Sequence, residues 1–295
     1  MIEIKNLVKN YGDLVAVNDL SFKVKKGELF AFLGVNGAGK STTINIICGL
    51  LEKTSGEIYF NGNLAKPNDS FIKEKIGIVF QNSCLDTPLT VLDNLKHRAS
   101  LYGIWGEDFK VKLEELTELF ELKDILNRPI KALSGGQKRK VDIARALIHN
   151  PEVLILDEPT TGLDPQTRQR IWQILNDKRK QNLTIILTTH YMEEASDADY
   201  VVIIDGGKKV ASGTPLELKN AYLNDFIYLY NASEEDIKKL NLPYKKIQNG
   251  FSISVKNTEQ AKELIIMHQE LFKDFEIVKG KMDDVFLTVC GKELK

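Results

Sequence analysis

The sequence has little cysteine and no long apolar run. Its three cysteines, Cys48, Cys84 and Cys290, lie far apart and form no Cys-x-x-Cys pair. This argues against a disulfide framework or a zinc site and fits a reducing cytoplasm. The longest apolar runs, such as LFAFLGV and VLIL, are far shorter than the roughly 20 residues of a spanning helix. The opening MIEIKNLVKN lacks a signal core. We therefore expect a soluble chain that reaches a membrane only through another protein.

A strong excess of one charge is also missing. The 40 Lys and Arg residues against 41 Asp and Glu give a net charge of −1, and no basic block stands out. A nucleic-acid-binding protein usually presents a basic face, so we expect no nucleic-acid partner, although a local patch can hide in a neutral total. The composition is that of a globular protein, 43% hydrophobic and 27% charged, and 295 residues suit one large domain or a main domain with a smaller one.

The order of apolar segments predicts an α/β fold. Residues 1–62 alternate as antiparallel strands do, and within them GELFAFLG leads through a glycine-rich loop into a helix. Three more apolar runs, at 153–157, 184–190 and 201–205, are separated by helical segments, which is typical of a parallel sheet covered on both faces. Residues 85–150 are expected to be mostly helical. The prediction is a parallel-sheet core with an N-terminal antiparallel β subdomain and an inserted helical subdomain.

The pattern changes near residue 215. Residues 216–295 alternate strand-like and helical segments, which predicts a small C-terminal α+β accessory domain after a main domain of residues 1–215. Within the smaller domain, YKKIQNGFSISVK is expected to be a strand and TEQAKELIIMHQELFK a helix.

The stretch GVNGAGKS, residues 34–41, matches the phosphate-binding pattern G-x-x-x-x-G-K-[ST]. Its glycines let several backbone N–H groups point inward, and the following helix adds its N-terminal partial charge. Lys40 can reach the β- and γ-phosphates, Ser41 can ligate Mg²⁺ and Thr42 can donate to a phosphate oxygen. A chance glycine turn is the alternative, which the strand–loop–helix context disfavours. The expected nucleotide-binding residues are Gly34, Asn36, Gly37, Ala38, Gly39, Lys40, Ser41 and Thr42.

Polar side chains also stand where other expected strands end. Asp157 and Glu158 follow VLIL, where Asp157 can hold the hydration shell of Mg²⁺ and Glu158 can orient or deprotonate the attacking water. His190 ends TIILTTH at the same edge and could contact a γ-phosphate. Gln81 follows KIGIVF and could complete the magnesium shell or be an ordinary loop residue. Solvated strand ends are the alternative for the acids, and His149, near a helix end, is expected to pair with the helix dipole. The expected catalytic residues are Lys40, Gln81, Glu158 and His190, and the expected metal ligands are Ser41, Gln81 and Asp157.

The segment LSGGQKRK, residues 133–140, places a second glycine-rich turn at the start of another helix. Ser134 and Gln137 fit a capping box. That role leaves Gly135 and Gly136 unexplained, because glycine costs about 1 kcal/mol relative to alanine in a helix interior. They make sense if oxygens of another molecule approach this backbone, since a helix N-terminus favours anions. Spacing alone does not say whose anion it is.

Together, GVNGAGKST, FQN, LSGGQ, VLILDEPTTGLD and TTH resemble the nucleotide-binding subunit of an ABC transporter, in order and approximate spacing, over residues 1–215. The combination is very specific, because LSGGQ is scarcely seen in other P-loop proteins. The resemblance implies an ATPase that uses ATP and Mg²⁺ and whose two copies associate head to tail. It also implies a separate integral membrane permease, which would hold the chain at the cytoplasmic face of the cell membrane.

The resemblance also implies roles for individual residues. Each ATP would lie between the phosphate loop of one copy and the LSGGQ of the other, with the TGLD segment at the same seam. Tyr11, in NYGDLVAV, matches the aromatic residue that stacks on adenine, although an ordinary strand-edge tyrosine is the alternative. The residues expected to act across the dimer are Ser134, Gly135, Gly136, Gln137 and Asp164.

The ending MDDVFLTVCGKELK is similar to the EDVFL…TG.EL ending of the drug- and antibiotic-exporter branch, the daunorubicin-resistance type. Val289-Cys290-Gly291 stands where that branch often has Leu-Thr-Gly, which is a small departure. The resemblance implies an exporter of drugs, antibiotics or lipophilic compounds. Importer ATPases of the sugar type carry a β-rich regulatory domain, which the alternation of strand and helix after residue 215 disfavours.

Two other classes of protein remain as alternatives. A soluble ABC-type ATPase acting on ribosomes or DNA usually joins two ATPase units or inserts long coiled coils, whereas this chain has one copy of each motif and no heptads. A GTP-dependent switch protein usually reads guanine with NKxD, which this sequence lacks.

Overall fold

The computed structural model describes residues 1–66 and 70–291, apart from the side chains of residues 70 and 71. Residues 292–295, the end of the exporter-like C-terminal motif, therefore lie outside the described residues. The chain divides into two compact units, Met1–Lys209 and Val210–Lys295. Across the described ranges, no helix combines the length and the apolar character needed to cross a bilayer.

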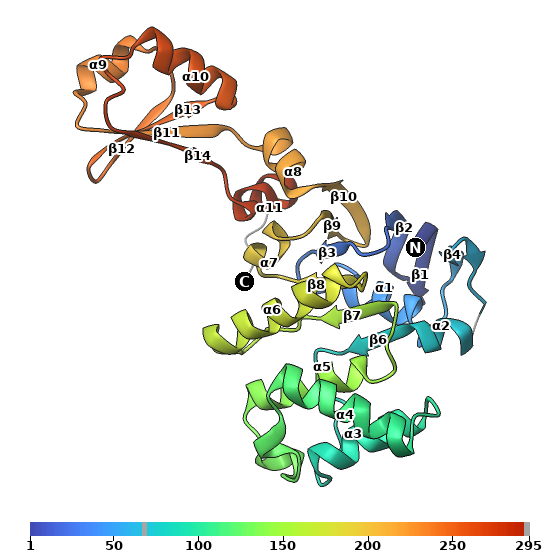
Figure 1. Cartoon of the computed structure of the whole chain (residues 1–295). Helices are drawn as coiled ribbons and strands as arrows, with labels where there is room; N and C mark the ends of the chain where they lie inside the picture. Colours follow the sequence, from blue (N-terminus) through green and yellow to red (C-terminus); the bar gives the residue numbers. More distant parts are fainter. Residues whose placement is uncertain (67–69, 292–295) are drawn as a thin grey trace. The chain divides into compact units, whose positions relative to one another are not determined.

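The first unit is built on a six-stranded sheet (Figure 1). Its strands, in spatial order, are β10 (Lys208–Gly213), of which only the first two residues belong to this unit, β9 (Tyr200–Asp205), β3 (Leu29–Leu33), β8 (Thr184–Thr189), β7 (Val153–Asp157) and β6 (Ile76–Val79). The five strands from β9 to β6 pair in parallel, so their carboxyl ends meet at one edge. Every residue of β3, β7 and β8 is buried, as a parallel sheet covered on both faces requires. The predicted α/β class is confirmed.

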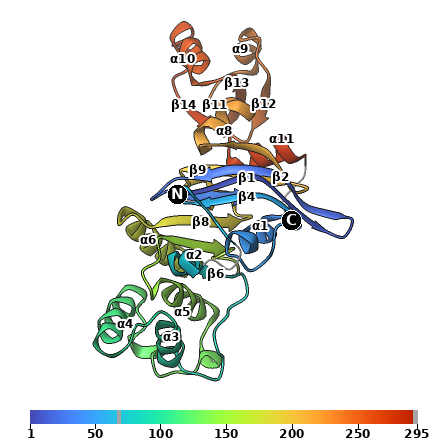
Figure 2. The ribbon, with the colours of Figure 1, turned by 90° about the vertical axis from the view of Figure 1, so that its right-hand side faces the viewer.

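An antiparallel sheet accompanies the parallel one. Its strands, in spatial order, are β2 (Leu14–Val24), β1 (Ile2–Tyr11), β4 (Ser55–Phe60) and β5 (Asn63–Leu64). Helix α1 (Lys40–Ile47) contacts both β2 and β7 and lies between the two sheets (Figure 2). Phe22, Phe30 and Phe32 pack together in the apolar core that joins the sheets, with ring centroids 5.1 to 6.4 Å apart. This core holds the β3–α1 loop at the carboxyl edge of the parallel sheet.

The inserted segment is helical, as predicted. It contains α3 (Val91–Ser100), α4 (Gly106–Phe120) and α5 (Gly135–Leu147), with 3-10 turns at Lys123–Ile125 and Ile130–Ala132. Helix α5 contacts α3, α4 and also β6, so it joins the helical region to the sheet. The remaining helices of this unit are α2 (Ser70–Lys75), α6 (Pro165–Lys180) and α7 (Met192–Ser196).

His149 does not serve as a charged partner of a helix dipole, and that expectation was wrong. Its ring stacks on Tyr102, with centroids 3.8 Å apart and planes 4° apart, and Nε2 lies 3.3 Å from the carbonyl oxygen of Ile76. Nδ1 is buried and finds no hydrogen-bond partner among the described residues. Burial, reinforced by the charge of Arg98, lowers the pKa of His149 to about 4. The imidazole is therefore neutral near pH 7 and packs as an aromatic ring.

His149→Phe should make the protein less sensitive to acid. Because the folded pKa is below the ordinary value of 6.5, the unfolded chain binds a proton that the folded one does not as pH falls from 6.5 toward 4. Wild-type stability therefore declines in that window, while the phenyl ring of the variant keeps the stack without a titrating group. Urea unfolding at pH 7 and pH 5 gives the free energy of unfolding of both proteins. Between pH 7 and pH 5, the variant should gain about 1 kcal/mol in this free energy relative to wild type, allowing for screening at a partly exposed ring. An equal difference at both pH values would contradict this explanation.

The second unit contains a four-stranded antiparallel sheet against which α9 and α10 pack. Its strands, in spatial order, are β12 (Tyr244–Ile247), β13 (Gly250–Val255), β11 (Asp225–Tyr230) and β14 (Phe275–Lys279). Its helices are α8 (Pro215–Tyr222), α9 (Glu234–Lys239), α10 (Thr258–Met267) and α11 (Met282–Cys290). Residues of α9 and α10 join the strands in one apolar core. The segment YKKIQNGFSISVK is a hairpin rather than one strand, because its Gln-Asn-Gly sequence turns the chain between β12 and β13.

Candidate functional site

The glycine loop between β3 and α1 has a backbone that side chains would disturb. Gly37 and Gly39 have φ angles of 81° and 103°, in the region that favours glycine. A Cβ at Gly39 would lie 2.5 Å from the carbonyl oxygen of Ala16, and a Cβ at Gly34 would lie 2.6 Å from that of Ile204. The chain's own packing thus requires glycine at both of these close approaches.

Lys40 folds back over this loop. Its Nζ donates to the carbonyl oxygens of Gly34, at 2.6 Å, and Val35, at 3.2 Å. Burial lowers the pKa of Lys40, and the negative charges of Glu158 and Asp157 oppose that effect. The loop therefore carries a largely desolvated positive charge, and such a charge attracts an anion more strongly than a lysine surrounded by water.

Ser41 and Asp157 bring two oxygen atoms together beside the loop. Ser41 Oγ donates to Asp157 Oδ2 at 3.2 Å, and Asp157 Oδ1 accepts from the hydroxyl of Thr188 on the neighbouring strand. Oxygen donors suit Mg²⁺, which usually keeps several waters and binds phosphate oxygens. Within residues 1–66 and 70–291, no group of three or more His, Cys, Asp or Glu side chains could hold a metal alone. The pair therefore fits a magnesium–nucleotide complex better than a free ion.

Glu158 is the point where the other strand-end residues meet. Gln81 Nε2 donates to Glu158 Oε2 at 3.0 Å, and His190 Nδ1 lies 3.3 Å from Oε1. The hydroxyl of Thr161 also points to Oε2, at 3.4 Å. The backbone of Glu158 has a φ of 47°, and its N–H donates to the carbonyl oxygen of Thr188 at 3.0 Å. The carboxylate is thus held from several sides and can accept a proton from a water beside it.

Lys40, Ser41, Gln81 and Glu158 line a cavity of about 380 Å³, whereas Asp157 and His190 are not part of its described lining. Tyr11 lies in its lining and is 48% exposed, with the ammonium of Lys9 5.0 Å from its ring centroid. Leu14 adds an exposed apolar side chain beside it, so this part of the cavity suits a flat base. The lining residues are Tyr11, Leu14, Ala16, Asn36, Gly37, Gly39, Lys40, Ser41, Thr42, Gln81 and Glu158.

The second glycine turn does not line this cavity. Ser134 Oγ accepts from the N–H of Gln137 at 3.2 Å, and Gln137 Oε1 accepts from the N–H of Ser134 at 3.0 Å, so the predicted capping box is confirmed. A Cβ at Gly136 would lie 3.0 Å from the methyl carbon of Thr167. A Cβ at Gly135 would meet no atom of the described residues within 4 Å beyond its own turn of helix. Packing within one copy therefore accounts in part for Gly136 but gives no reason for Gly135.

Asp164 has a structural role that the sequence analysis did not assign, although Asp before Pro165 is typical of a helix start. It is the N-cap of α6, and its Oδ1 accepts from the N–H of Thr167 at 2.9 Å. Hydrogen bonds from the Thr167 hydroxyl, and then from the Thr167 backbone N–H, lower the pKa of Asp164. Asp164 lies close to Gly136, because the threonine that Asp164 caps is also the residue that a Cβ at Gly136 would meet.

Thr188, the first residue of TTH, is a site residue to which the sequence analysis gave no role. It is fully buried at the end of β8, opposite Asp157 in the parallel register. Its hydroxyl binds the Asp157 carboxylate and also lies 3.2 Å from the backbone nitrogen of Glu158. The sequence feature that could have identified it is the pair of threonines, residues 188 and 189, that follows the run TIIL at the carboxyl end of a parallel strand.

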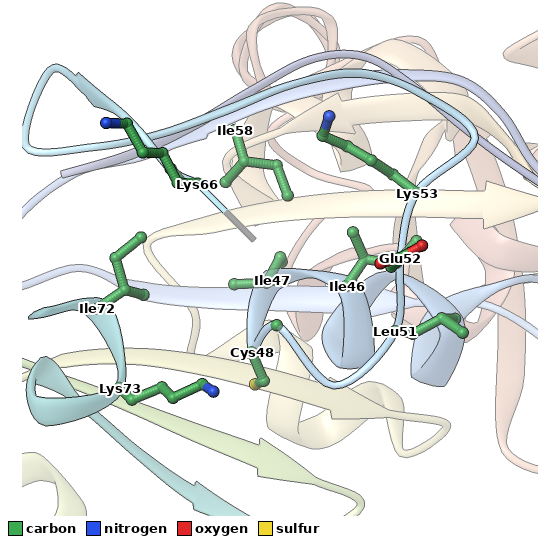
Figure 3. Close-up of a pocket in the computed structure, with 12 residues that line it drawn as sticks. Ile46, Ile47, Cys48, Leu51, Glu52, Lys53, Ile58, Lys66, Ile72 and Lys73 are labelled. Carbon is green, nitrogen blue, oxygen red and sulfur yellow. The ribbon is translucent and has the colours of Figure 1, made fainter. Parts of the chain in front are cut away.

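A second hollow, of about 260 Å³, lies against the far end of α1 (Figure 3). Ile46 and Ile47 of α1, Ile58 of β4 and Ile72 of α2 form its apolar walls. Cys48 also lines it, and burial raises the pKa of this thiol to about 12, which keeps it protonated and unreactive. None of the phosphate-binding motifs contributes a residue to its described lining, so the nucleotide chemistry belongs to the larger cavity.

Comparison with known proteins agrees with the motifs and the fold. The sequence profile of the ABC transporter family matches residues 17–161. The chain is 33% identical over 299 residues to the Nod factor export ATP-binding protein I of Cupriavidus pinatubonensis, over 100% of this chain and 92% of that protein. It is 36% identical over 272 residues to the linearmycin resistance ATP-binding protein LnrL of Bacillus subtilis, over 92% of this chain and 84% of that protein.

A solved structure shows the same fold with the product of the reaction. This structure is a dimeric ATP-binding cassette in a post-hydrolysis state, bound to ADP and Pi. It matches with a TM-score of 0.66 and 31% identity, over 72% of this chain and 98% of the other. The chain belongs to the ABC transporter family, as an ATP-binding subunit that hydrolyses ATP.

Proposed function

We propose that two copies of this subunit close head to tail around two ATP molecules and so drive a separate membrane permease. The observation that carries this proposal is Gly135. Glycine is costly in a helix, and packing within one copy gives no reason for it. The requirement is met if the γ-phosphate held by a second copy approaches the first turn of α5, where backbone N–H groups favour an anion. Asp164, close to that turn, would lie at the same seam.

The residues around the cavity have different roles in ATP binding and hydrolysis. Lys40 and the loop N–H groups bind the phosphates, and Tyr11 stacks on the adenine. Glu158 accepts the proton of the attacking water, while Gln81 and His190 hold its carboxylate in place. Ser41 and Asp157, with Gln81 nearby, would hold Mg²⁺, which neutralises charge that develops on the phosphates.

ATP would close the dimer because each γ-phosphate contacts both copies, and hydrolysis would open it by removing those contacts. Such a ligand shifts the equilibrium only through its stronger binding to the closed state. The loop that follows Gln81 lies between the sheet and the helical region, and we propose that it receives a cytoplasmic segment of the permease. The chain would then work at the cytoplasmic face of the membrane.

The direction and substrate class of transport rest on the relatives. One relative is named for Nod factor export and another for linearmycin resistance. We therefore propose export of drugs, antibiotics or other lipophilic compounds, with the substrate contacts in the permease rather than in this chain.

Loss of this gene should raise cellular retention of amphiphilic compounds, and Lys40→Ala should fail to reverse the loss. Dye and antibiotic retention would be measured in cells that lack the gene, and again after return of wild-type or Lys40→Ala protein at equal levels. Wild type should restore efflux, because the phosphate loop is intact. Equal restoration of efflux by both proteins would contradict ATP-driven export. Retention in the deletion strain that equals wild-type retention, for every amphiphilic compound toxic to that strain, would contradict it as well.

A further inference from the structure

Arg139 connects the helix that begins with the second glycine turn to the backbone of the catalytic strand ends. Its guanidinium is buried and donates to four carbonyl oxygens. These belong to Phe80 at 2.7 Å, Asp157 at 3.1 Å, Glu158 at 2.8 Å and Pro159 at 2.6 Å. A planar fork with five N–H donors can hold several fixed acceptors at once, which a lysine ammonium cannot match.

A second buried side chain of α5 holds the same loop on its other side. Asp142, one turn beyond Arg139, accepts hydrogen bonds from the Ser83 side chain and from the backbone N–H of Cys84. Arg139 binds the carbonyl just before Gln81, so these two side chains bracket that glutamine. Movement of α5 relative to the sheet would therefore move both ends of the Gln81 loop.

The buried charge of Arg139 is balanced rather than left unpaired. Asp142, Asp157 and Glu194 are the carboxylates whose fields act on its guanidinium. Taking one partner from a buried ionic network usually costs far more than changing a surface pair. Arg139 is therefore a fixed connection between α5 and the sheet, not a side chain that exchanges partners with solvent.

The bond to Glu158 has a specific consequence, because this residue has an unusual backbone. A φ of 47° is rare for a glutamate and persists only where neighbouring groups over-determine it. Arg139 donates to the carbonyl oxygens of Glu158 and Pro159, and the carbonyl oxygen of Thr188 accepts from the N–H of Glu158. The three contacts fix the direction in which the carboxylate leaves the strand.

We propose that Arg139 is a positioning residue that ties the Ser134 turn to the Glu158 carboxylate of the same copy. This inference rests on the proposed function, in which that turn contacts the partner's nucleotide. A shift of α5 on contact with the partner's γ-phosphate reaches Gln81 and Glu158 through the Arg139 guanidinium. Each copy thereby adjusts its own catalytic carboxylate according to whether its neighbour holds ATP.

Arg139→Met should lower kcat and leave ATP binding nearly unchanged. The loss should be on the order of 10- to 100-fold, as for a catalytic group displaced by about 1 Å, with KM within about twofold of wild type. Arg139→Lys should retain part of the activity, because it keeps the charge and some donors. Arg98→Met is the matched control, since Arg98 is a partly buried arginine of α3 that binds the Tyr102 hydroxyl at 2.7 Å and none of the site residues. It should keep wild-type kcat.

Hydrogen exchange on the wild-type and variant proteins tests the same inference without relying on hydrolysis. In Arg139→Met the amides of residues 157–161 and 80–84 should exchange at least about tenfold faster, while those of α6 keep their wild-type rates. Arg98→Met should leave all of these rates unchanged. If Arg139→Met disturbs the fold as a whole, the comparison is made with Arg139→Lys.

The outcomes separate this inference from the proposed function. Unchanged exchange at 157–161 in a folded Arg139 variant overturns the positioning role, and so does an unchanged kcat. An equal loss of kcat and ATP affinity overturns it as well. Absence of ATP-driven dimers in Glu158→Gln would instead contradict the head-to-tail proposal, while faster exchange in Arg139→Met would still support the link from α5 to Glu158.

Discussion

Glu158→Gln should bind ATP with nearly wild-type affinity and hydrolyse it at least about 100-fold more slowly, the loss expected on removal of a general base. The amide has almost the shape of the carboxylate, and its oxygen can still accept from Gln81 Nε2, which now bonds Glu158 at 3.0 Å. It cannot take the proton of the attacking water. Lys40, Ser41 and the glycine loop stay unchanged, so the nucleotide remains bound. Phosphate release under saturating Mg-ATP measures the turnover.

The same variant should accumulate a dimer with Mg-ATP, because hydrolysis no longer removes the γ-phosphate that holds the closed state. Sedimentation with and without nucleotide gives the fraction of dimer. Glu193→Gln is a suitable control, since Glu193 is an exposed acid of α7 and should keep wild-type turnover. Turnover of Glu158→Gln above about a tenth of wild type would rule out the base role. A variant that binds Mg-ATP but stays monomeric at high concentration would rule out the closed dimer.

The sequence predicted those parts of the site that are contiguous in the chain. GVNGAGKS specifies its own loop because glycine spacing, strand and helix lie within a few residues of one another. Asp157, 116 residues after Ser41, could also be placed, since parallel strands end at one edge and the cavity must lie there. The head-to-tail roles of residues 134–137 and of Asp164 stay predictions, because they depend on a second copy.

What sequence reasoning missed depends on register and on buried polar contacts. Thr188 faces Asp157 only because β7 and β8 pair in one particular register, and no local pattern fixes that pairing. Arg139 was not selected because a basic residue in a helix is usually solvated, and its four acceptors are backbone carbonyls that carry no side-chain signature. The unusual φ of Glu158 and the stacked ring of His149 are likewise results of tertiary packing.

Gly135→Glu should fold normally and lose ATPase activity. Substitution of Ser134 would remove the N-cap of α5 and cost about 1 kcal/mol of stability. A loss of activity could then result from unfolding rather than from a damaged active site. Gly135 avoids this, since its Cβ would meet open space and the capping box stays intact. A carboxylate in the first turn is favourable for the helix dipole but repels a phosphate brought by a partner. Stability and activity should therefore change in opposite directions, as measured by thermal unfolding and phosphate release.

Mixing Gly135→Glu with Lys40→Ala tests whether the two glycine loops of one active site come from different copies. Each variant alone has two defective sites. In a mixed dimer, one site combines both defects while the other has an intact phosphate loop and an intact Ser134 turn. Random pairing at equal amounts makes half of the dimers mixed, so activity should rise to about a quarter of wild type if the two sites act independently.

The matched control is a mixture of Lys40→Ala with Glu158→Gln. Both residues line one cavity of one copy, so every site in every pairing is defective and the mixture should stay inactive. Recovery of ATPase activity in the first mixture, with no activity in the second, requires that the Ser134 turn contact the nucleotide held by the neighbouring copy. If both mixtures are inactive, although two different affinity tags show that mixed dimers form, then each copy completes its own site. The glycine at 135 would then need another explanation, because nothing within a copy's described residues calls for it.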